Sequence, residues 1–316
     1  MKRKTALAAV AGGIGLTALA NARLRDVGEL EQPLPGRDRR YDWRGTEIAY
    51  VDHGDTDDPD LLFLHGPNAA GTSKEFEPIW EALAEDFHVI APDFPGFGRS
   101  DRPPLYYSAE LYTSFVRDFI ADRTENPVVL ASSLSGAYAV AAAREDPTRV
   151  ATLVLVCPTD DTFPGRKAWV RTLLRSSFVG EALFNLMASR PSIRHSNADH
   201  AYYDPSRQPA GLDEYQWQTA HQPNARYAPA SFVSGYLDPA FDLGEELAAL
   251  DVPTTLIWGR EAETTPLSGG RELAETVGAR LTVVDYAKLL PHAEHPEEFL
   301  EAMDVDELLA DVEESV

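Results

Sequence analysis

Residues 128–140, with the sequence VVLASSLSGAYAV, contain the feature that decides the fold of this chain. An apolar run predicts a buried strand, a serine-rich turn follows, and an alanine-rich segment predicts a helix. Small residues allow a tight strand-to-helix turn that exposes a serine at its tip. Ala131 and Ser135 take the small positions on either side of Ser133, so Ser133 is the predicted nucleophile. A frame shifted by two residues would select Ser135, which would then lie one turn into the helix.

The composition limits the classes of function. The chain has 316 residues, with 51 acidic against 28 basic residues and a formal net charge of −23. Such a surface repels nucleic acid, so a nucleic-acid partner is not expected. We interpret the acidity as adaptation to high salt, which screens the self-repulsion. The single cysteine, Cys157, excludes an intrachain disulfide and ends an apolar run, as a packed core thiol does.

Residues 1–26 are predicted to form a signal or membrane-anchor segment. MKRK is followed by the apolar run Thr5–Ala20, which ends in small residues. The run is short and weakly apolar for a membrane-spanning helix, so a cleaved signal, an anchor and a loose apolar tail all stay open. The first two are favoured, and we expect an exported or membrane-associated protein rather than a cytoplasmic one. Residues 27–40, rich in Pro and Arg, form the expected linker.

The rest of the chain predicts an α/β fold with a mostly parallel central sheet covered by helices. Arg44-Gly45 indicates a hairpin between two extended runs. Continuous apolar runs separated by helical patterns then indicate parallel strands buried on both faces; they are 61–65, 88–92, 128–132, 151–157, 253–258 and 280–285. Residues 41–162 and 251–316 are the two expected parts of this core. The aromatic-rich residues 163–250 lack a strand pattern and are expected to form a helical lid over the carboxyl ends of the strands.

Five segments, in this order, resemble the α/β-hydrolase superfamily: FLHGPNAAG (63–71), VIAPDFPGFGRSDRP (89–103), LASSLSGA (130–137), TLIWGREAETTP (255–266) and LLPHAEHPEEF (289–299). The resemblance extends from Tyr41 to Met303, and residues 93–103 are its most specific part. Three segments, VCPTDD (156–161), WGREAETTPL (258–267) and KLLPHAEHPEEF (288–299), also resemble a narrower branch of the superfamily known from photosynthetic organisms and salt-adapted archaea. The resemblance to the superfamily implies the α/β-hydrolase fold, a hydrolase activity of ester type, Ser133 as the nucleophile and no cofactor. The chain shows no phosphate-binding or dinucleotide glycine motif and no metal-binding histidine spacing, so neither a cofactor nor a metal is expected.

The resemblance also shows where this chain departs from the family pattern. The position of the catalytic histidine is occupied by Leu289, and the usual position of its acid partner is Ala262. The N–H of Leu134 is the first expected oxyanion donor. The second donor position is Pro67, which has no N–H, so Asn68 is expected to replace it.

Three interpretations of the site remain open. In a rewired hydrolase, His292 would be the base and Asp160 the acid. Further candidates for these two roles are His295, His65, Asp161, Glu261 and Glu263. Each of these histidines also has a purely structural explanation: His292 and His295 would be surface or helix-capping residues, and His65 would hydrogen-bond to the backbone of its loop. In the second interpretation the protein binds a small apolar or ester-type molecule in an apolar pocket under the lid without catalysis, and in the third it performs cofactor-free chemistry without a covalent intermediate. The sequence fixes neither the substrate nor the oligomeric state.

Overall fold

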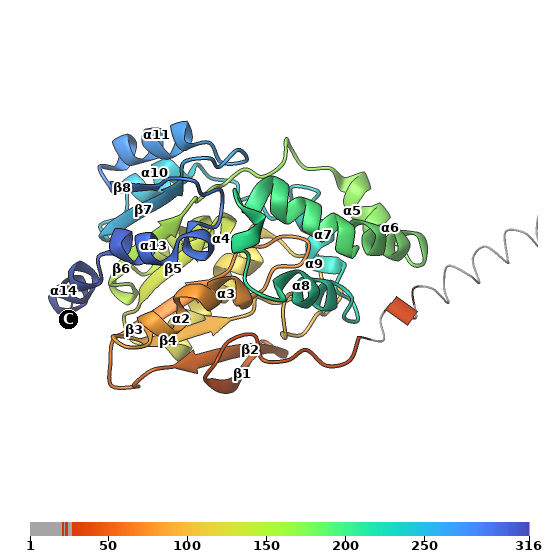
Figure 1. Ribbon diagram of the computed structural model, residues 1–316, viewed down its shortest axis with the longest axis horizontal. Helices are drawn as coiled ribbons and strands as arrows, with labels where there is room; N and C mark the ends of the chain where they lie inside the picture. Colours follow the sequence, from red (N-terminus) through yellow and green to blue (C-terminus); the bar gives the residue numbers. More distant parts are fainter. Residues whose placement is uncertain (1–20, 22, 25–26, 316) are drawn as a thin grey trace, which may run out of the picture.

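One eight-stranded sheet organises the molecule. The computed structural model describes residues 21, 23–24 and 27–315, so most of the expected signal or anchor segment lies outside the described residues. The strand order is β1-β2-β4-β3-β5-β6-β7-β8 (Figure 1). The first pairings, β1 with β2 and β2 with β4, are antiparallel, and the remaining pairings are parallel. The strands are β1 (Arg37–Trp43), β2 (Thr46–His53), β3 (Asp60–Leu64), β4 (His88–Pro92), β5 (Val128–Ser132), β6 (Thr152–Val156), β7 (Thr254–Gly259) and β8 (Arg280–Val284). The α/β-hydrolase fold expected from the sequence is confirmed.

The hairpin between β1 and β2 turns where the sequence predicted it. Trp43 pairs with Thr46, which leaves Arg44 and Gly45 as a two-residue loop. Both have positive φ, 54° and 78°. Positive φ at both central residues defines the tight hairpin turn whose twist matches that of its strands, and glycine adopts it without strain.

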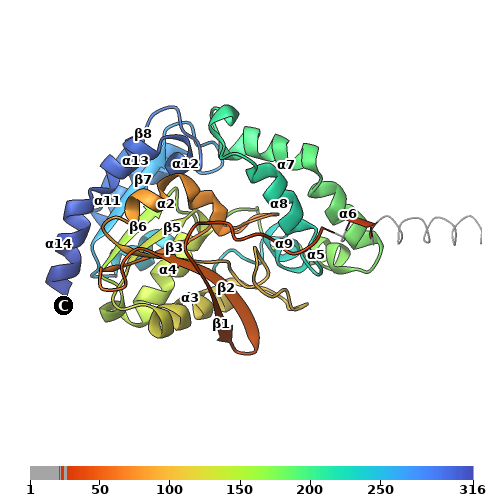
Figure 2. The ribbon, with the colours of Figure 1, turned by 60° about the horizontal axis from the view of Figure 1, so that its bottom comes forward.

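Helices cover both faces of the sheet because alternate residues of each strand point to opposite sides. In β3, for example, Leu62 and Leu64 pack into one hydrophobic cluster, whereas Leu61 and Phe63 pack into the other. The first face is covered by α3 (Ala109–Arg123), α4 (Leu134–Glu145), α10 (Leu243–Ala248) and α11 (Leu267–Val277). The second is covered by α2 (Glu77–Leu83), α13 (Pro296–Met303) and α14 (Val305–Ser315) (Figure 2). Helix α14 directly follows α13 in the chain.

Residues 163–250, all of them described, contain helices and no strand. The helices are α5 (Ala168–Arg175), α6 (Val179–Met187), α7 (Arg190–Ser196), α8 (Leu212–Ala220), α9 (Tyr227–Phe232) and α10. Helix α10 packs on α4 and α11 and is part of the layer that covers the sheet. Helices α5–α9 gather at one end of the sheet in both views (Figures 1 and 2). Of these, α6 and α8 pack on Ala70, after β3, and α8 also packs on Leu290 and Ala293, after β8.

No helix within the described part of the chain is both long enough and apolar enough to cross a lipid bilayer.

Candidate functional site

Ser133 occupies a sharp turn between β5 and α4. Strand β5 ends at Ser132 and α4 begins at Leu134, and Ser133 between them has φ 55° and ψ −127°. Its N–H donates to the carbonyl of Val156 (2.8 Å), and its carbonyl accepts from the N–H of Gly136 (3.0 Å). A side-chain-bearing residue held at such angles costs about 1–3 kcal/mol, and residues of this kind cluster at functional sites. The chain therefore keeps the strained turn that presents a nucleophile.

Ser135, the serine of the shifted frame, has a structural role. Its side chain is fully buried, and its hydroxyl donates to the carbonyl of His65 (2.6 Å). This hydrogen bond ties the first turn of α4 to the end of β3. The geometry supports Ser133 over Ser135 as the reactive position.

The loop that follows β3 passes directly beside the turn. A Cβ atom placed on Gly66 would lie 3.6 Å from the Cβ of Ser133, so this loop lines the space next to the serine. Within the loop, the Oδ1 atom of Asn68 accepts from the N–H of Ala70 (2.7 Å). The Nδ2 group of Asn68 has no protein partner within the described chain, and Leu134 is the first residue of α4, where N–H groups have no acceptor inside the helix. These two groups are the expected oxyanion donors.

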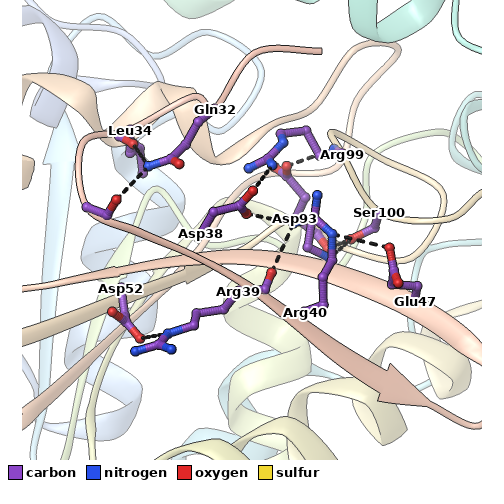
Figure 3. Close-up of polar contacts among 12 residues, drawn as sticks. Gln32, Leu34, Asp38, Arg39, Arg40, Glu47, Asp52, Asp93, Arg99 and Ser100 are labelled. Atoms are coloured by element: carbon purple, nitrogen blue, oxygen red, sulfur yellow. Dashed lines mark hydrogen bonds and ion pairs between the residues drawn. The ribbon is translucent and has the colours of Figure 1, made fainter. Parts of the chain in front are cut away.

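His65 and Asp93 hold the loops around the site. The Nε2 atom of His65 accepts from the N–H of Phe94 (3.1 Å), which places the proton on Nδ1, facing the carbonyl of Gly66 (3.2 Å). Burial lowers the pKa of His65. The carboxylate of Asp93 accepts from the N–H of Arg99 (2.8 Å), and its carbonyl accepts from the hydroxyl of Ser100 (2.6 Å) (Figure 3). Both ring nitrogens of His65 thus bind loop backbone, which is the structural role that the sequence suggested. They are therefore not available to act as a base.

The two positions that the family resemblance assigns to the histidine and its acid lie in one apolar cluster. Leu289, which follows β8, packs against the cluster formed by Cys157, Trp258 and Ala262. Burial raises the pKa of the Cys157 thiol to about 12, so the thiol stays protonated and neutral. The chain thus brings the two positions together and fills them with groups that accept no proton.

His292 is buried rather than placed at the surface, which corrects the surface or capping role weighed for it. Its ring lies between those of Phe76 and Phe299, with centroid distances of 5.2 and 5.6 Å. Neither ring nitrogen has a hydrogen-bond partner within the described chain, so the hydroxyl of Ser133 does not donate to it. Burial lowers the pKa of His292 to about 3. The structure therefore places His292 as a neutral core group.

The carboxyl group that faces His292 is that of Glu75, at 3.9 Å from Nε2, and not that of Asp160. Asp160 accepts from the N–H of Leu243 (2.7 Å) at the start of α10. It borders a surface cavity of about 470 Å³ together with Asp161 and Asp238.

The remaining candidates also have local partners. His295 lies 3.0 Å from the carbonyl of Tyr286 through Nε2. Glu261 accepts from the N–H of Ala287 (3.0 Å), and Glu263 is an exposed side chain 3.9 Å from Lys288. None of these contacts forms a histidine–carboxylate pair beside Ser133.

Glu75 is the polar group near the site that the sequence-based assignment missed. It lies in a short 3-10 helix (Ser73–Phe76) and is nearly fully buried. Its carboxyl accepts from the N–H of Gly66 (3.3 Å), and burial raises its pKa to about 8 against the opposing effects of Ser132 and that N–H. The sequence contained a signal for this burial. Glu75, Ile79 and Leu83 follow one another at intervals of four residues, which puts them on one face of a helix, and Ile79 and Leu83 are buried.

No group of three or more His, Cys, Asp or Glu side chains within the described residues is arranged to hold a metal ion.

Comparison with known proteins agrees with this fold. Residues 61–302 match the model of the Alpha/beta hydrolase family. The pimeloyl-[acyl-carrier protein] methyl ester esterase of Aeromonas hydrophila is 27% identical over 254 residues, which cover 78% of this chain and 94% of that protein. A haloalkane dehalogenase of Bradyrhizobium diazoefficiens is 32% identical over 121 residues, covering 37% of this chain and 38% of that protein.

Solved structures show the same fold at low identity. A membrane phospholipase A aligns with a TM-score of 0.67 at 23% identity and covers 99% of both chains. A bromoperoxidase from Bacillus anthracis aligns with a TM-score of 0.68 at 18% identity, covering 85% of this chain and 99% of that chain. The chain belongs to the alpha/beta hydrolase family.

Proposed function

We propose that the protein binds a small ester-type molecule at Ser133 and hydrolyses it slowly, without a Ser-His-acid triad. The strained turn at Ser133 and the first N–H groups of α4 support the binding of a carbonyl group at this point. The esterase relative, which aligns over 94% of its own length, supports an ester as the substrate class.

The packing of Leu289 against Ala262 carries the proposal. A serine hydroxyl is a weak nucleophile until a base takes its proton, and this cluster contains no base. Binding and oxyanion stabilisation alone leave an acceleration of about 10³–10⁴ over water when the triad is disabled. Turnover on that scale is the expected behaviour of this site.

A second function, non-catalytic binding of a small apolar or ester-type molecule, is favoured by a different observation. The strongest candidate histidine, His292, lies between two phenylalanine rings, and neither of its ring nitrogens has a hydrogen-bond partner within the described residues. A site used only for binding needs no proton acceptor. This function predicts that ligands bind while Ser133 forms no covalent bond.

Covalent labelling with a fluorophosphonate probe separates these functions. The parent and Ser133→Ala are compared in a buffer salty enough to keep the fold, checked by circular dichroism. Slow labelling of the parent that is lost in Ser133→Ala supports slow hydrolysis, and a folded parent that never labels supports binding alone. Labelling as fast as that of a triad enzyme would show that Ser133 has a base after all.

Restoring the two triad positions makes the test sharper. The double variant Ala262→Asp/Leu289→His should label about 10²–10⁴ times faster than the parent, the usual contribution of general acid–base catalysis. The matched control is Ala262→Asp/Leu290→His, because Leu290 packs in a different cluster with Tyr202 and Leu212. An equal gain in both double variants would refute the assignment of Leu289 to the base position.

A further inference from the structure

The exposed apolar side chains of this protein concentrate on one surface. Ten large hydrophobic side chains are exposed within the described residues, and eight of them come from α5, α6, the turn between them and residues 105–106. We call this surface the lid face: Leu105, Tyr106, Trp169, Leu173, Phe178, Val179, Leu183 and Leu186. Contiguous exposed apolar surface of this kind marks an interaction site.

The spacing along both helices makes the lid face continuous. Val179, Leu183 and Leu186 lie at intervals of four and three residues along α6, so they form one stripe, and Trp169 and Leu173 do the same on α5. Trp169 and Leu186 are each 70% exposed. Helices α5 and α6 lie side by side in both views (Figures 1 and 2).

Residues 105–106 join the same surface. The guanidinium of Arg175, on α5, donates to the carbonyls of Pro104 (2.9 Å) and Leu105 and lies 4.0 Å from the ring centroid of Tyr106. The turn before α3 is therefore held against α5.

The charge of this segment is opposite to that of the whole chain. Residues 163–180 contain four basic side chains and no carboxylate, in a chain with a net charge of −23. Within the described part of the chain none of the four forms an ion pair. The three arginines contact aromatic rings and backbone carbonyls, and Arg166 also lines the cavity that Asp160 and Asp238 border. They are Arg166, Lys167, Arg171 and Arg175. An anionic partner would complement these cations.

The N-terminal part of the chain arrives at the same surface. Asn21 donates to the carbonyl of Phe178 (3.3 Å) and accepts from Asn185 (3.1 Å). With Leu24 and Leu186 it also lines a groove of about 560 Å³. The sequence that precedes Asn21 is basic at residues 1–4 and apolar at residues 5–20. The described residue that follows this apolar sequence, Asn21, thus contacts Phe178 of the lid face and Asn185 of α6.

We propose that the lid face docks on a lipid bilayer that carries anionic headgroups. Aromatic and aliphatic side chains enter the headgroup region, while the four cations lie at the level of the lipid phosphates. A symmetric second copy fits less well, because it would bring the same cations against each other. The proposal concerns a surface and holds whether or not Ser133 turns over an ester.

Site-directed spin labelling tests this contact directly in the full-length chain. Cys157 is the only cysteine and is buried, so Leu186→Cys and the control Tyr286→Cys each carry one accessible thiol. The vesicles contain phosphatidylcholine alone or phosphatidylcholine with 30% phosphatidylglycerol. On the anionic vesicles, the label at position 186 should become protected from a water-soluble relaxing agent and accessible to oxygen, and the label at position 286 should stay in water.

Each other outcome overturns the proposal. Failure to bind anionic vesicles refutes it, and so does binding that leaves the label at position 186 in water, since the N-terminal segment alone would then make the contact. Protection that grows with protein concentration in the absence of vesicles assigns the lid face to a second copy.

Surface variants give a second measurement. Arg166→Gln and Lys167→Gln should each weaken binding to the anionic vesicles about fivefold at low salt, with Arg149→Gln as the matched control. The double variant Trp169→Glu/Leu186→Glu should weaken binding to the anionic vesicles at least tenfold. The control double variant Tyr203→Glu/Tyr286→Glu, at exposed residues outside the lid face, should leave this binding unchanged. Equal effects in the variants and their controls would show that no defined surface is used.

Discussion

The buried carboxyl of Glu75 should make the protein less stable as the pH rises. Burial raises its pKa from the ordinary 4.5 to about 8, so the folded protein holds a proton that the unfolded chain has already lost. Between pH 4.5 and about pH 8 the folded state therefore binds more protons than the unfolded state, and the free energy of unfolding falls as the pH increases. The loss is absent below about pH 4.5 and complete above about pH 8.

The magnitude follows from the width of that interval. At about 1.4 kcal/mol for each pH unit, the interval from 4.5 to about 8 corresponds to about 5 kcal/mol of unfolding free energy. That is a large fraction of the 5–15 kcal/mol that holds a typical domain together. Burial of the Glu75 carboxyl is the physical cause, and the hydrogen bond from the N–H of Gly66 opposes it.

Denaturant unfolding of the parent and of Glu75→Gln between pH 5 and pH 9, at one fixed salt concentration, checks this reasoning. The glutamine keeps the shape and carries no titrating proton, so between pH 5 and pH 9 the variant should keep its stability where the parent loses about 4 kcal/mol. Glu81→Gln, at an exposed position of α2, is the control and should follow the parent. Parallel curves for the parent and Glu75→Gln would refute the assignment of the alkaline loss to Glu75.

Three further substitutions test the turns around the site by denaturant unfolding. Gly98→Ala should destabilise the fold by about 3 kcal/mol, because Gly98 has a φ of 48° and the new Cβ would lie 1.9 Å from the carboxyl carbon of Asp93. The control is Gly269→Ala in α11, where the new Cβ meets open space, and it should be neutral or stabilising. Ser135→Ala should cost about 1–3 kcal/mol through loss of its buried hydrogen bond, and probe labelling at Ser133 should survive. Ser133→Gly should stabilise by about 1–3 kcal/mol through relief of the strained turn, and a loss of stability would show that no strain is stored there.

Much of the fold could be predicted from local patterns. The buried parallel strands are continuous apolar runs. The structure places β4 (His88–Pro92) and β5 (Val128–Ser132) at the expected bounds and the other four within one residue of them at each end. The turn at Ser133 was also local, because a serine flanked by small residues between a strand and a helix has few alternative geometries. The helix at 305–315 was missed although its apolar residues recur at helical spacing, because the assignment stopped at the preceding helix.

The sequence by itself determined the fold and the place of Ser133 in the turn between a strand and a helix, since both depend on residue type and spacing along the chain. Only the tertiary structure decided what surrounds them. Leu289 and Ala262 are 27 positions apart and become one apolar cluster, and Glu75 and His292 are 217 positions apart and become neighbours in the core. Burial sets the charge of these two groups, and burial is a property of the packed molecule that no local pattern contains.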